Sequence, residues 1–363
     1  MEEKKEAENR QESECVQEEK IFTDVKPENK KADGVVPSGE FYSPEPVISR
    51  EDTLARINAA RERFLTYANQ QDKIKKIILL SFLGIFFLLA IVLLINPKLT
   101  GTLFTPLIVV FVVFLLVTYF LVQSAKKKKS IQFDEYRYRY FLAVESYCYF
   151  QLGISDLSMS YNSKIDPEEV KAMGCYENIV DAPSRDIVKG AMFGVGFTCA
   201  EVKIVTGDSG NKKNQSALFA GKLFHFDLEC KKSGKMYLYL KGCGDGFPTE
   251  LQGMEEVELK DLKKEFKVFS SFDRPEGMIG KKTAELLNRF VIDDVIEDIL
   301  VSISGKGVYI GLSLTRDYMT IPYENEVDGR GIDHLKNDLD LIKNLIVSLL
   351  SNKNYRKPEE NAG

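Results

Sequence analysis

Residues 77–95 read IILLSFLGIFFLLAIVLLI and residues 103–122 read LFTPLIVVFVVFLLVTYFLV, with the short segment NPKLTGT (96–102) between them. Neither apolar run contains an Asp, Glu, Lys, Arg or His residue. As α-helices, the two runs reach roughly 28–30 Å, which is the thickness of the hydrocarbon core of a bilayer. Because neither run has the polar face of a helix on a globular domain, the sequence predicts a transmembrane helical hairpin over residues 77–122.

Basic residues flank the two runs and set the expected orientation. The connecting segment holds one cation, Lys98, whereas the outer flanks hold Lys73, Lys75, Lys76, Lys126, Lys127, Lys128 and Lys129. Because cytoplasmic loops carry an excess of cations, we expect a multi-pass protein of the plasma or inner membrane with both termini in the cytoplasm. The seven flanking lysines are candidates for contact with anionic lipid headgroups, although a general orientation signal is the commoner explanation of such residues.

The remainder of the 363-residue chain divides into segments of different composition. Residues 1–48 are polar and rich in Glu, Lys, Gln, Asn and Pro, so we expect a disordered tail. Residues 49–76 are predicted to form an amphipathic juxtamembrane helix, and residues 126–160 a cytosolic helix. Residues 161–355 are expected to form a cytosolic α+β domain, and residues 356–363 a short disordered tail.

The two predicted helices beside the hairpin each carry an apolar stripe with more than one explanation. The helix over residues 49–76 begins at Ser49, a suitable N-cap, and its stripe is Leu54, Ile57, Ala60, Phe64, Leu65 and Ala68. Such a stripe lies on a lipid surface or packs on a domain, and the sequence leaves both alternatives open. The second helix carries an aromatic stripe that fits an interface, although a core-facing stripe is commoner. Its members are Phe133, Tyr136, Tyr140, Phe141, Val144, Tyr147, Cys148 and Leu152.

Beyond residue 160 the local patterns predict strands in hairpins, with helices that do not alternate with them strand by strand. Asp166 is typical of a helix cap, with Pro167 at the first helical position. The alternation of apolar and polar residues predicts strands from Val195 onward, a hairpin of 217–230 with 236–241, and a hairpin of 300–304 with 308–314. Helices are predicted at 259–266, 278–299 and 332–350. This order favours an antiparallel α+β fold over a doubly wound sheet.

Composition restricts the classes of partner and cofactor. The net charge of −5 argues against a nucleic-acid partner that needs a large basic surface. The six cysteines show no CxxC spacing, so we expect free, reduced thiols. No motif in the chain predicts a cofactor or a metal, and the lipid bilayer is the expected environment, with a protein partner or a second copy at the cytoplasmic face.

Two glycine-rich segments resemble catalytic or phosphate-binding loops. Gly207-Asp208-Ser209-Gly210 copies the nucleophile tetrapeptide of chymotrypsin-like proteases, but both histidines of the chain follow it, whereas that fold supplies its base before the serine. Gly242-Cys243-Gly244-Asp245-Gly246 lacks a following GK[ST] and leads into Phe247-Pro248. Tight turns explain both segments more simply.

Acidic and histidine residues offer only weak metal sites. Asp293, Asp294, Glu297 and Asp298 gather four carboxylates at helical spacing, but a solvated helix face is the better explanation. His225 falls on the polar face of a predicted strand and His334 near a helix start, so ordinary surface histidines are favoured over a metal pair. We therefore predict no catalytic, cofactor-binding or metal-binding residues.

The C-terminal half also carries short motifs: LFAGKLF (218–224), EFKVFS (265–270) and VYIGL (308–312). With two apolar runs near the N-terminus and a long region after them, these motifs resemble the bacterial family called domain of unknown function 3137. The similarity covers roughly residues 126–350. The resemblance implies two membrane spans followed by a cytosolic region, and it implies no known activity and no site residues.

These observations predict an integral membrane protein whose cytosolic α+β domain binds a protein or lipid partner and has no catalytic role. One alternative is a membrane-bound hydrolase, which a pocket joining two or more of Asp208, Ser209, His225 and Asp245 would favour. Another is an accessory subunit of a transport or secretion complex. The apolar runs lack the ionisable groups of an ion or proton pathway, so a transporter acting alone is not expected.

Overall fold

A computed structural model describes residues 39–44, 49–95, 100–173, 179–206, 216–240, 253–291, 296–314, 323 and 325–357. Most of the predicted N-terminal tail lies outside these residues, as does the tail beyond residue 357. The four residues that join the two long helices and both glycine-rich segments discussed above also lie outside them.

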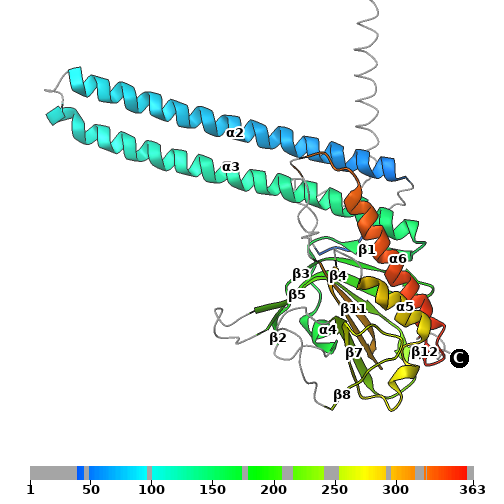
Figure 1. Cartoon of the computed structure of the whole chain (residues 1–363). Helices are drawn as coiled ribbons and strands as arrows, with labels where there is room; N and C mark the ends of the chain where they lie inside the picture. Colours follow the sequence, from blue (N-terminus) through cyan, green and yellow to red (C-terminus); the bar gives the residue numbers. More distant parts are fainter. Residues whose placement is uncertain are drawn as a thin grey trace, which may run out of the picture. The chain divides into compact units, whose positions relative to one another are not determined.

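Two long helices, α2 (Arg50–Ile95) and α3 (Thr100–Gln151), run side by side (Figure 1). The N–H of Asp52 donates to Ser49 Oγ at 3.0 Å, which confirms Ser49 as the cap of α2. Each helix contains one of the apolar runs and continues well beyond it, into charged sequence and then into the domain. Phe82 of α2 packs on Phe111 and stacks on Phe114 of α3, with ring centroids 5.7 and 5.3 Å apart.

The predicted transmembrane hairpin over residues 77–122 is wrong. In the part of the chain that the structure describes, no helix combines the length and the apolar character needed to cross a bilayer. The spans at 77–95 and 103–122 are therefore corrected to segments of two longer helices of 46 and 52 residues, each of which also carries charged residues. The placement in the plasma or inner membrane with cytoplasmic termini, and the integral membrane class, rested on those spans and are corrected with them.

The rest of the fold is built on an antiparallel sheet of ten strands, in the order β1-β3-β4-β5-β11-β10-β7-β9-β8, with β2 also paired to β4. Its first strands are β1 (Ser155–Ser160), β2 (Ile179–Asp181), β3 (Ser184–Met192), β4 (Val195–Thr206) and β5 (Ser216–Phe226). The others are β7 (Lys235–Leu240), β8 (Glu255–Glu256), β9 (Phe266–Ser270), β10 (Ile296–Ser304) and β11 (Gly307–Leu314). The α+β class with a large antiparallel sheet agrees with the sequence.

Several predicted elements differ from the observed ones. The helix predicted over residues 126–160 ends at Gln151, and its last residues form strand β1 instead. Strand β5 pairs with β4 and β11 rather than with β7, so the predicted hairpin of 217–230 with 236–241 does not form. The short strand β6 (Glu229–Cys230) pairs with β12 (Tyr355–Arg356) in a separate two-stranded sheet. The helix predicted over residues 259–266 does not form: residues 260–265 form turns and bends, and Phe266 begins strand β9.

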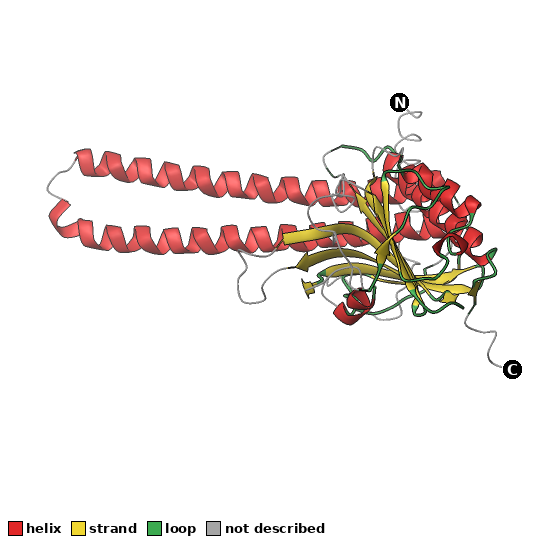
Figure 2. Ribbon diagram, turned by 60° about the horizontal axis from the view of Figure 1, so that its bottom comes forward, coloured by secondary structure: helices red, strands yellow, loops and turns green. Residues whose placement is uncertain are grey.

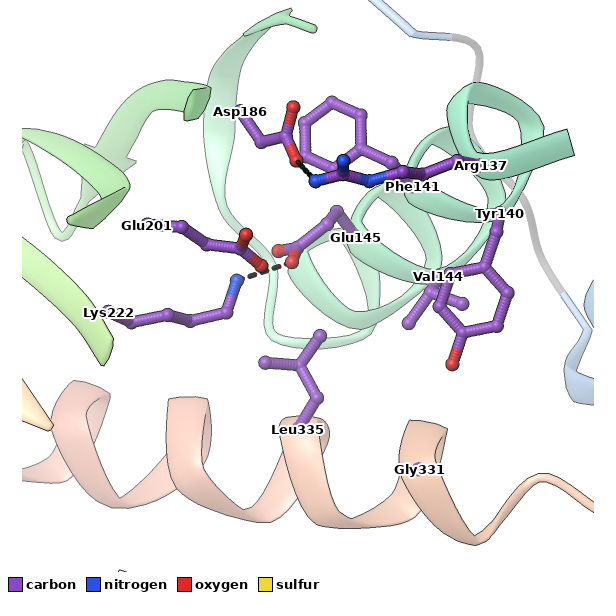
Figure 3. A pocket seen from close by; sticks show the side chains of 10 residues that line it. All are labelled: Arg137, Tyr140, Phe141, Val144, Glu145, Asp186, Glu201, Lys222, Gly331 and Leu335. Carbon is purple, nitrogen blue, oxygen red and sulfur yellow. Dashed lines mark hydrogen bonds and ion pairs between the residues drawn. The ribbon is translucent and has the colours of Figure 1, made fainter. Parts of the chain in front are cut away.

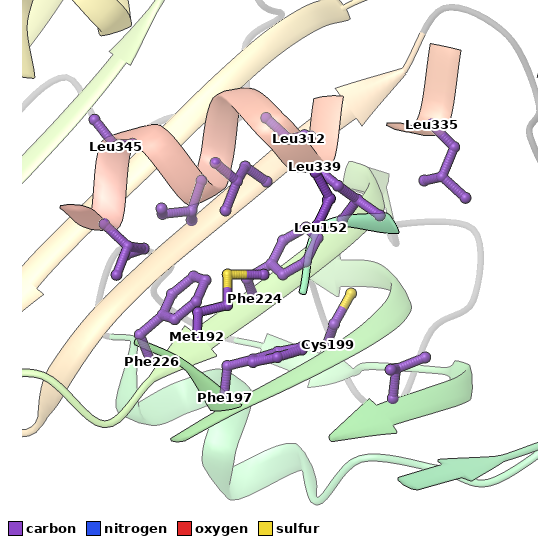
Figure 4. Close-up of a cluster of buried hydrophobic side chains, with 14 of the residues drawn as sticks. Leu152, Met192, Phe197, Cys199, Phe224, Phe226, Leu312, Leu335, Leu339 and Leu345 are labelled. Atoms are coloured by element: carbon purple, nitrogen blue, oxygen red, sulfur yellow. The ribbon is translucent and has the colours of Figure 1, made fainter. Parts of the chain in front are cut away.

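Helices α5 (Lys281–Phe290) and α6 (Arg330–Leu350) lie over one face of the sheet together with the end of α3 (Figures 1 and 2). Figure 4 shows the core between them, where Phe197, Phe224 and Phe226 of the strands lie beneath Leu339 and Leu345 of α6. The opposite face is covered by α4 (Pro167–Ala172), whose N-cap is Asp166 as predicted, and it holds a second, smaller cluster around Val170. A single-turn 3-10 helix, η3 (Pro275–Gly277), precedes α5.

The N-terminal part of α2 packs on the domain, which decides between the two alternatives for its apolar stripe. Ile57, Ala60, Phe64 and Ala68 are buried in the same core as α5 and α6. Asn58 accepts a hydrogen bond from the N–H of Val327 at 3.0 Å and donates to its carbonyl at 3.3 Å. The aromatic stripe of α3 is likewise core-facing. The N-terminal part of α2 and the C-terminal part of α3, which we call the base of the hairpin, therefore both pack in the core of the domain.

Candidate functional site

A small pocket with several charged residues in its lining lies between α3, the sheet and the start of α6 (Figure 3). Its cavity volume is about 40 Å³, which suits water-sized groups rather than an organic substrate. The lining side chains come from helices α3 and α6 and from strands β3, β4 and β5. They are Arg137, Tyr140, Phe141, Val144, Glu145, Asp186, Glu201, Lys222, Gly331 and Leu335.

A row of alternating charges crosses three neighbouring strands, and two of its members, Glu201 and Lys222, line this pocket. Arg185 of β3 lies opposite Glu201 of β4, and Glu201 lies opposite Lys222 of β5. The Nε of Arg185 donates to Glu201 Oε2 at 2.7 Å. Opposite charges on directly paired residues stabilise a sheet, so this row supports the register of the three strands.

Glu145 of α3 lies above the row and pairs with Lys222 (Figure 3). Lys222 Nζ donates to Glu145 Oε1, and both side chains are more than nine-tenths buried. The second carboxylate oxygen of Glu145 is buried and has no hydrogen-bond partner among the described residues. The ion pair, with this oxygen beside a water-sized cavity, is a buried polar feature that costs desolvation energy.

A bulge in β3 supplies the third acidic group. Between Arg185 and Val188 the pairing with β4 shifts, and Asp186 adopts a left-handed backbone conformation with φ of 58°. Asp186 accepts from the backbone N–H of Asn162 at 3.0 Å and lies 3.4 Å from Arg137 Nη2 of α3. The bulge therefore allows consecutive residues of β3 to join the same charged cluster.

Burial and pairing shift the pKa values of these groups. Burial is the largest influence on Glu145, and it outweighs the attraction of Lys222, so the pKa of the carboxyl is raised. Burial opposes the charged form of Lys222, but Glu145, Cys199 and Glu201 together outweigh it and raise the pKa of the ammonium. Pairing with these carboxylates therefore favours the ammonium form of Lys222.

The charges of the cluster balance, which limits what it can do chemically. Three carboxylates, from Glu145, Asp186 and Glu201, face three cations, from Arg137, Arg185 and Lys222. A balanced cluster in a cavity of this size leaves no excess charge for an anionic or cationic substrate. These six side chains connect α3 to strands β3, β4 and β5 through ion pairs, and we call them the charged junction.

Of the residues considered for catalysis or metal binding, His225 and His334 are described, and neither lines this pocket. The ring of His225 stacks on that of Tyr309 with centroids 4.2 Å apart, and His334 lies near the start of α6. Glu297 and Asp298 belong to strand β10 rather than to a helix, while Asp293 and Asp294 lie outside the described residues. Over the described ranges, no three His, Cys, Asp or Glu side chains gather as metal ligands do. Cys148, Cys199 and Cys230 are present as free thiols.

The lysines predicted to meet lipid headgroups lie on the two helices of the hairpin, and two of them contact Asp72. Lys73, Lys75 and Lys76 are on α2, and Lys126, Lys127, Lys128 and Lys129 are on α3. Lys75 Nζ lies 3.1 Å from Asp72 Oδ1 and Lys129 Nζ lies 3.6 Å from Asp72 Oδ2. Lys129 therefore links α3 to α2 through Asp72, whereas the pair of Lys75 with Asp72 lies within α2. Contact of the seven lysines with lipid headgroups stays a prediction.

Beyond this link, the hairpin exposes large apolar side chains on both helices, which we call the apolar section. Only a few rings, such as Phe82 and Phe114, are partly covered at the seam between α2 and α3. On α2 the exposed members are Ile77, Leu79, Leu80, Leu83, Ile85, Phe86, Phe87, Leu88 and Ile91. On α3 they are Val109, Phe111, Val112, Val113, Leu115, Leu116, Val117, Tyr119, Phe120 and Leu121. Exposed apolar surface of this extent marks an interaction site.

Sequence reasoning missed the charged junction, although two signals for it were present. Lys222 interrupts an apolar strand and shares its face with Phe224 and Phe226, which are completely buried. Glu145 likewise interrupts the aromatic stripe of α3 between Val144 and Tyr147. A charged residue on a buried face predicts a buried partner of opposite sign.

Comparison with known proteins adds little to this description. No family model and no curated protein matches the chain. Among solved structures, it is similar to the crystal structure of the mycobacterial trehalose monomycolate transport factor A, TtfA, with 11% sequence identity and a TM-score of 0.27. The matched region covers 53% of this chain and 91% of that one. A likeness this slight carries no argument, and the resemblance to domain of unknown function 3137 stays a prediction.

Proposed function

We propose that this chain is a non-catalytic interaction protein that associates with a second copy of itself through the apolar section of the hairpin. The supporting observation is the exposure of large apolar side chains on both helices, including Phe87 at 68% and Phe120 at 67%. Water in contact with so many apolar side chains is unfavourable, and burial against a partner removes that cost.

We propose a second copy as the partner because its apolar section has the same length as the surface to be covered. A two-fold axis parallel to the hairpin places the apolar sections of both copies at the same level, and the two domains then lie at the same end. Two hairpins packed in this way form a four-helix bundle, in which each hairpin covers part of the exposed apolar surface of the other. The phenylalanine seam between Phe82 and Phe114 keeps the two helices of one hairpin together before association.

The attachment of the hairpin to the domain gives this association a defined geometry. The base of α2 is held by Ile57, Phe64 and the paired hydrogen bonds of Asn58 with Val327. The base of α3 is held by the charged junction around Glu145 and Lys222. Contacts at the apolar section are thereby linked to the position of the sheet.

Hydrolysis is the weaker alternative. The pocket is balanced in charge and water-sized, and pairing with carboxylates favours the ammonium form of Lys222. His225 stacks on Tyr309 instead of lining the pocket. No observation on the described residues favours an accessory role in a transport or secretion complex either.

Light scattering on the purified full-length chain tests the proposal. We expect a molar mass twice that of one chain, and we expect Phe87→Glu and Phe120→Glu to reduce it to that of one chain. Phe193→Glu is the matched control, because Phe193 is an aromatic residue exposed at 50% on the domain, away from the hairpin. A wild-type chain that stays single, or that enters phospholipid vesicles as a single chain, would overturn the proposal.

A further inference from the structure

Strand β1 forms one end of the sheet, and its outer edge is occupied by a short piece of the chain from before the hairpin. The N–H of Tyr42 donates to the carbonyl of Met159 at 3.0 Å, and the N–H of Met159 donates back to Tyr42 at 2.9 Å. The N–H of Gly39 donates to the carbonyl of Tyr161 at 3.3 Å. Residues 39–44 therefore lie antiparallel along β1, and we call them the strap.

Besides its backbone hydrogen bonds, the strap is held by one aromatic anchor, Tyr42, and by a cation–π contact of Phe41. The ring of Tyr42 packs edge-on against Tyr138 of α3, with centroids 6.4 Å apart, and contacts the main core. Its hydroxyl is buried and has no hydrogen-bond partner among the described residues. The neighbouring ring of Phe41 is exposed at 46% and lies beneath the ammonium of Lys189, 4.8 Å away.

These contacts contribute only a small free energy to the pairing of the strap with β1. Three backbone hydrogen bonds and one partly buried ring must offset the entropy of ordering six residues. Burial of the Tyr42 hydroxyl without a partner removes part of the gain from its ring. The strap remains in place because it is tethered to α2, which gives it a high effective concentration at the edge.

We infer that the outer edge of β1 is a binding site for an extended peptide, and that the strap occupies it as a tethered ligand. The partner that fits is an extended segment with Phe or Tyr at the place of Tyr42, since the buried hydroxyl contributes no hydrogen bond. Addition of a strand to a free sheet edge is a common mode of peptide recognition, in which the backbone supplies affinity and one pocket supplies specificity. This inference is independent of association through the hairpin.

Peptide binding in trans is the decisive experiment. The ligand is a fluorescent peptide with the sequence PSGEFYSPEP (residues 37–46), and the receptor is the full-length chain carrying Tyr42→Ala, which releases the strap. We expect saturable binding, roughly tenfold or more tighter than to the wild-type chain, because the tethered strap competes there at an effective concentration in the millimolar range. Phe41→Ala is the matched control, because its exposed ring leaves the strap in place, and it should bind no better than wild type.

Variant peptides define the anchor. Replacement of the tyrosine by alanine in the peptide should abolish binding, and replacement by phenylalanine should preserve or tighten it. Absence of binding to Tyr42→Ala, or equal binding to Tyr42→Ala and wild type, would overturn the inference.

Hydrogen exchange on the wild-type chain gives a second test that needs no variant. The amides of Tyr42 and Met159 should exchange together and much faster than that of Phe224 in the centre of the sheet, because the strap opens without global unfolding. Exchange of the Tyr42 and Met159 amides as slow as that of Phe224 would show that the strap is a permanent strand.

Discussion

Lys222 of β5 and Glu145 of α3 form an ion pair inside the protein, where each side chain is more than nine-tenths buried. The pair joins a helix of the hairpin to the third of the strands that form the charged row. Such pairs cost desolvation energy when they form, so their role is to fix one arrangement rather than to add stability. In this chain the arrangement is the position of α3 on the sheet.

Removal of one partner should be far more harmful than removal of both. Lys222→Met leaves the Glu145 carboxylate buried without a counter-ion, and we expect a loss of about 3–5 kcal/mol in the free energy of unfolding. The double variant Glu145→Leu with Lys222→Met should recover most of this loss, because an apolar pair of similar volume needs no desolvation. Urea denaturation of the full-length chain measures both, and equal losses in the single and double variants would contradict a paired role.

Gly221 should tolerate no side chain. A Cβ at this position would lie 1.8 Å from the carbonyl oxygen of Leu312 in the neighbouring strand β11. We expect Gly221→Ala to separate β5 from β11 and to cost about 3 kcal/mol or more, measured by urea denaturation. Gly305→Ala is the matched control, since a Cβ there meets no atom within 4 Å. Equal stability of the two variants would refute the close approach of the strands.

Asn58 should be the polar residue of α2 that matters most to the attachment of the hairpin. Its side-chain amide makes both hydrogen bonds that the backbone of Val327 offers, at a position where Val327 is buried. Asn58→Ala leaves those backbone groups without partners, so we expect a loss of about 1–3 kcal/mol in thermal or urea unfolding. Asn69→Ala, on the same helix at an exposed position, should change little. A comparable loss in both variants would mean that helix propensity, not the contact, is responsible.

Buried tyrosines predict a loss of stability at high pH. Burial is the main cause that raises the pKa of Tyr140 to about 12, with Glu145 adding to it, from an ordinary value of 10.0. A pKa raised in the folded state gives stability that is fully present below pH 10 and is lost as the pH rises towards 12.

Tyr140→Phe removes the contribution of this tyrosine and tests it. The variant should lose less stability than the wild type between pH 10 and pH 12, measured as the shift of the urea midpoint with pH. Tyr119→Phe, which removes an exposed phenol, is the control. A wild-type profile that matches the Tyr140→Phe profile over this range would be inconsistent with a buried, protonated phenol.

Local patterns predicted those elements whose stabilising contacts are close in sequence. The hairpin of β10 and β11 turns at Gly305-Lys306-Gly307 as expected, and α6 covers Arg330–Leu350 where a helix was predicted over 332–350. Asp166 caps α4, and its carboxylate accepts from the N–H of Glu168. In each case the signal and the structure that it specifies lie within a few residues of one another.

Contacts between residues far apart in the sequence could not be predicted from local patterns. Strand β5 contains a valid alternating pattern, but nothing in it specifies β4 and β11 as neighbours rather than β7. The charged junction was missed for the same reason, because Glu145 and Lys222 are separated by 77 positions. The error over residues 77–122 arose differently: the apolar runs report hydrophobicity, but they do not specify where α2 and α3 begin and end.

The most direct test of the central claim is site-specific photo-crosslinking of the full-length chain in the cells that produce it. A photoreactive phenylalanine analogue replaces Phe87, Phe120 or, as control, Phe193, all of which are exposed in one chain. Association through the apolar section predicts a covalent dimer of this chain from Phe87 and Phe120 and none from Phe193. No dimer from either hairpin position, or as much dimer from Phe193, would contradict it.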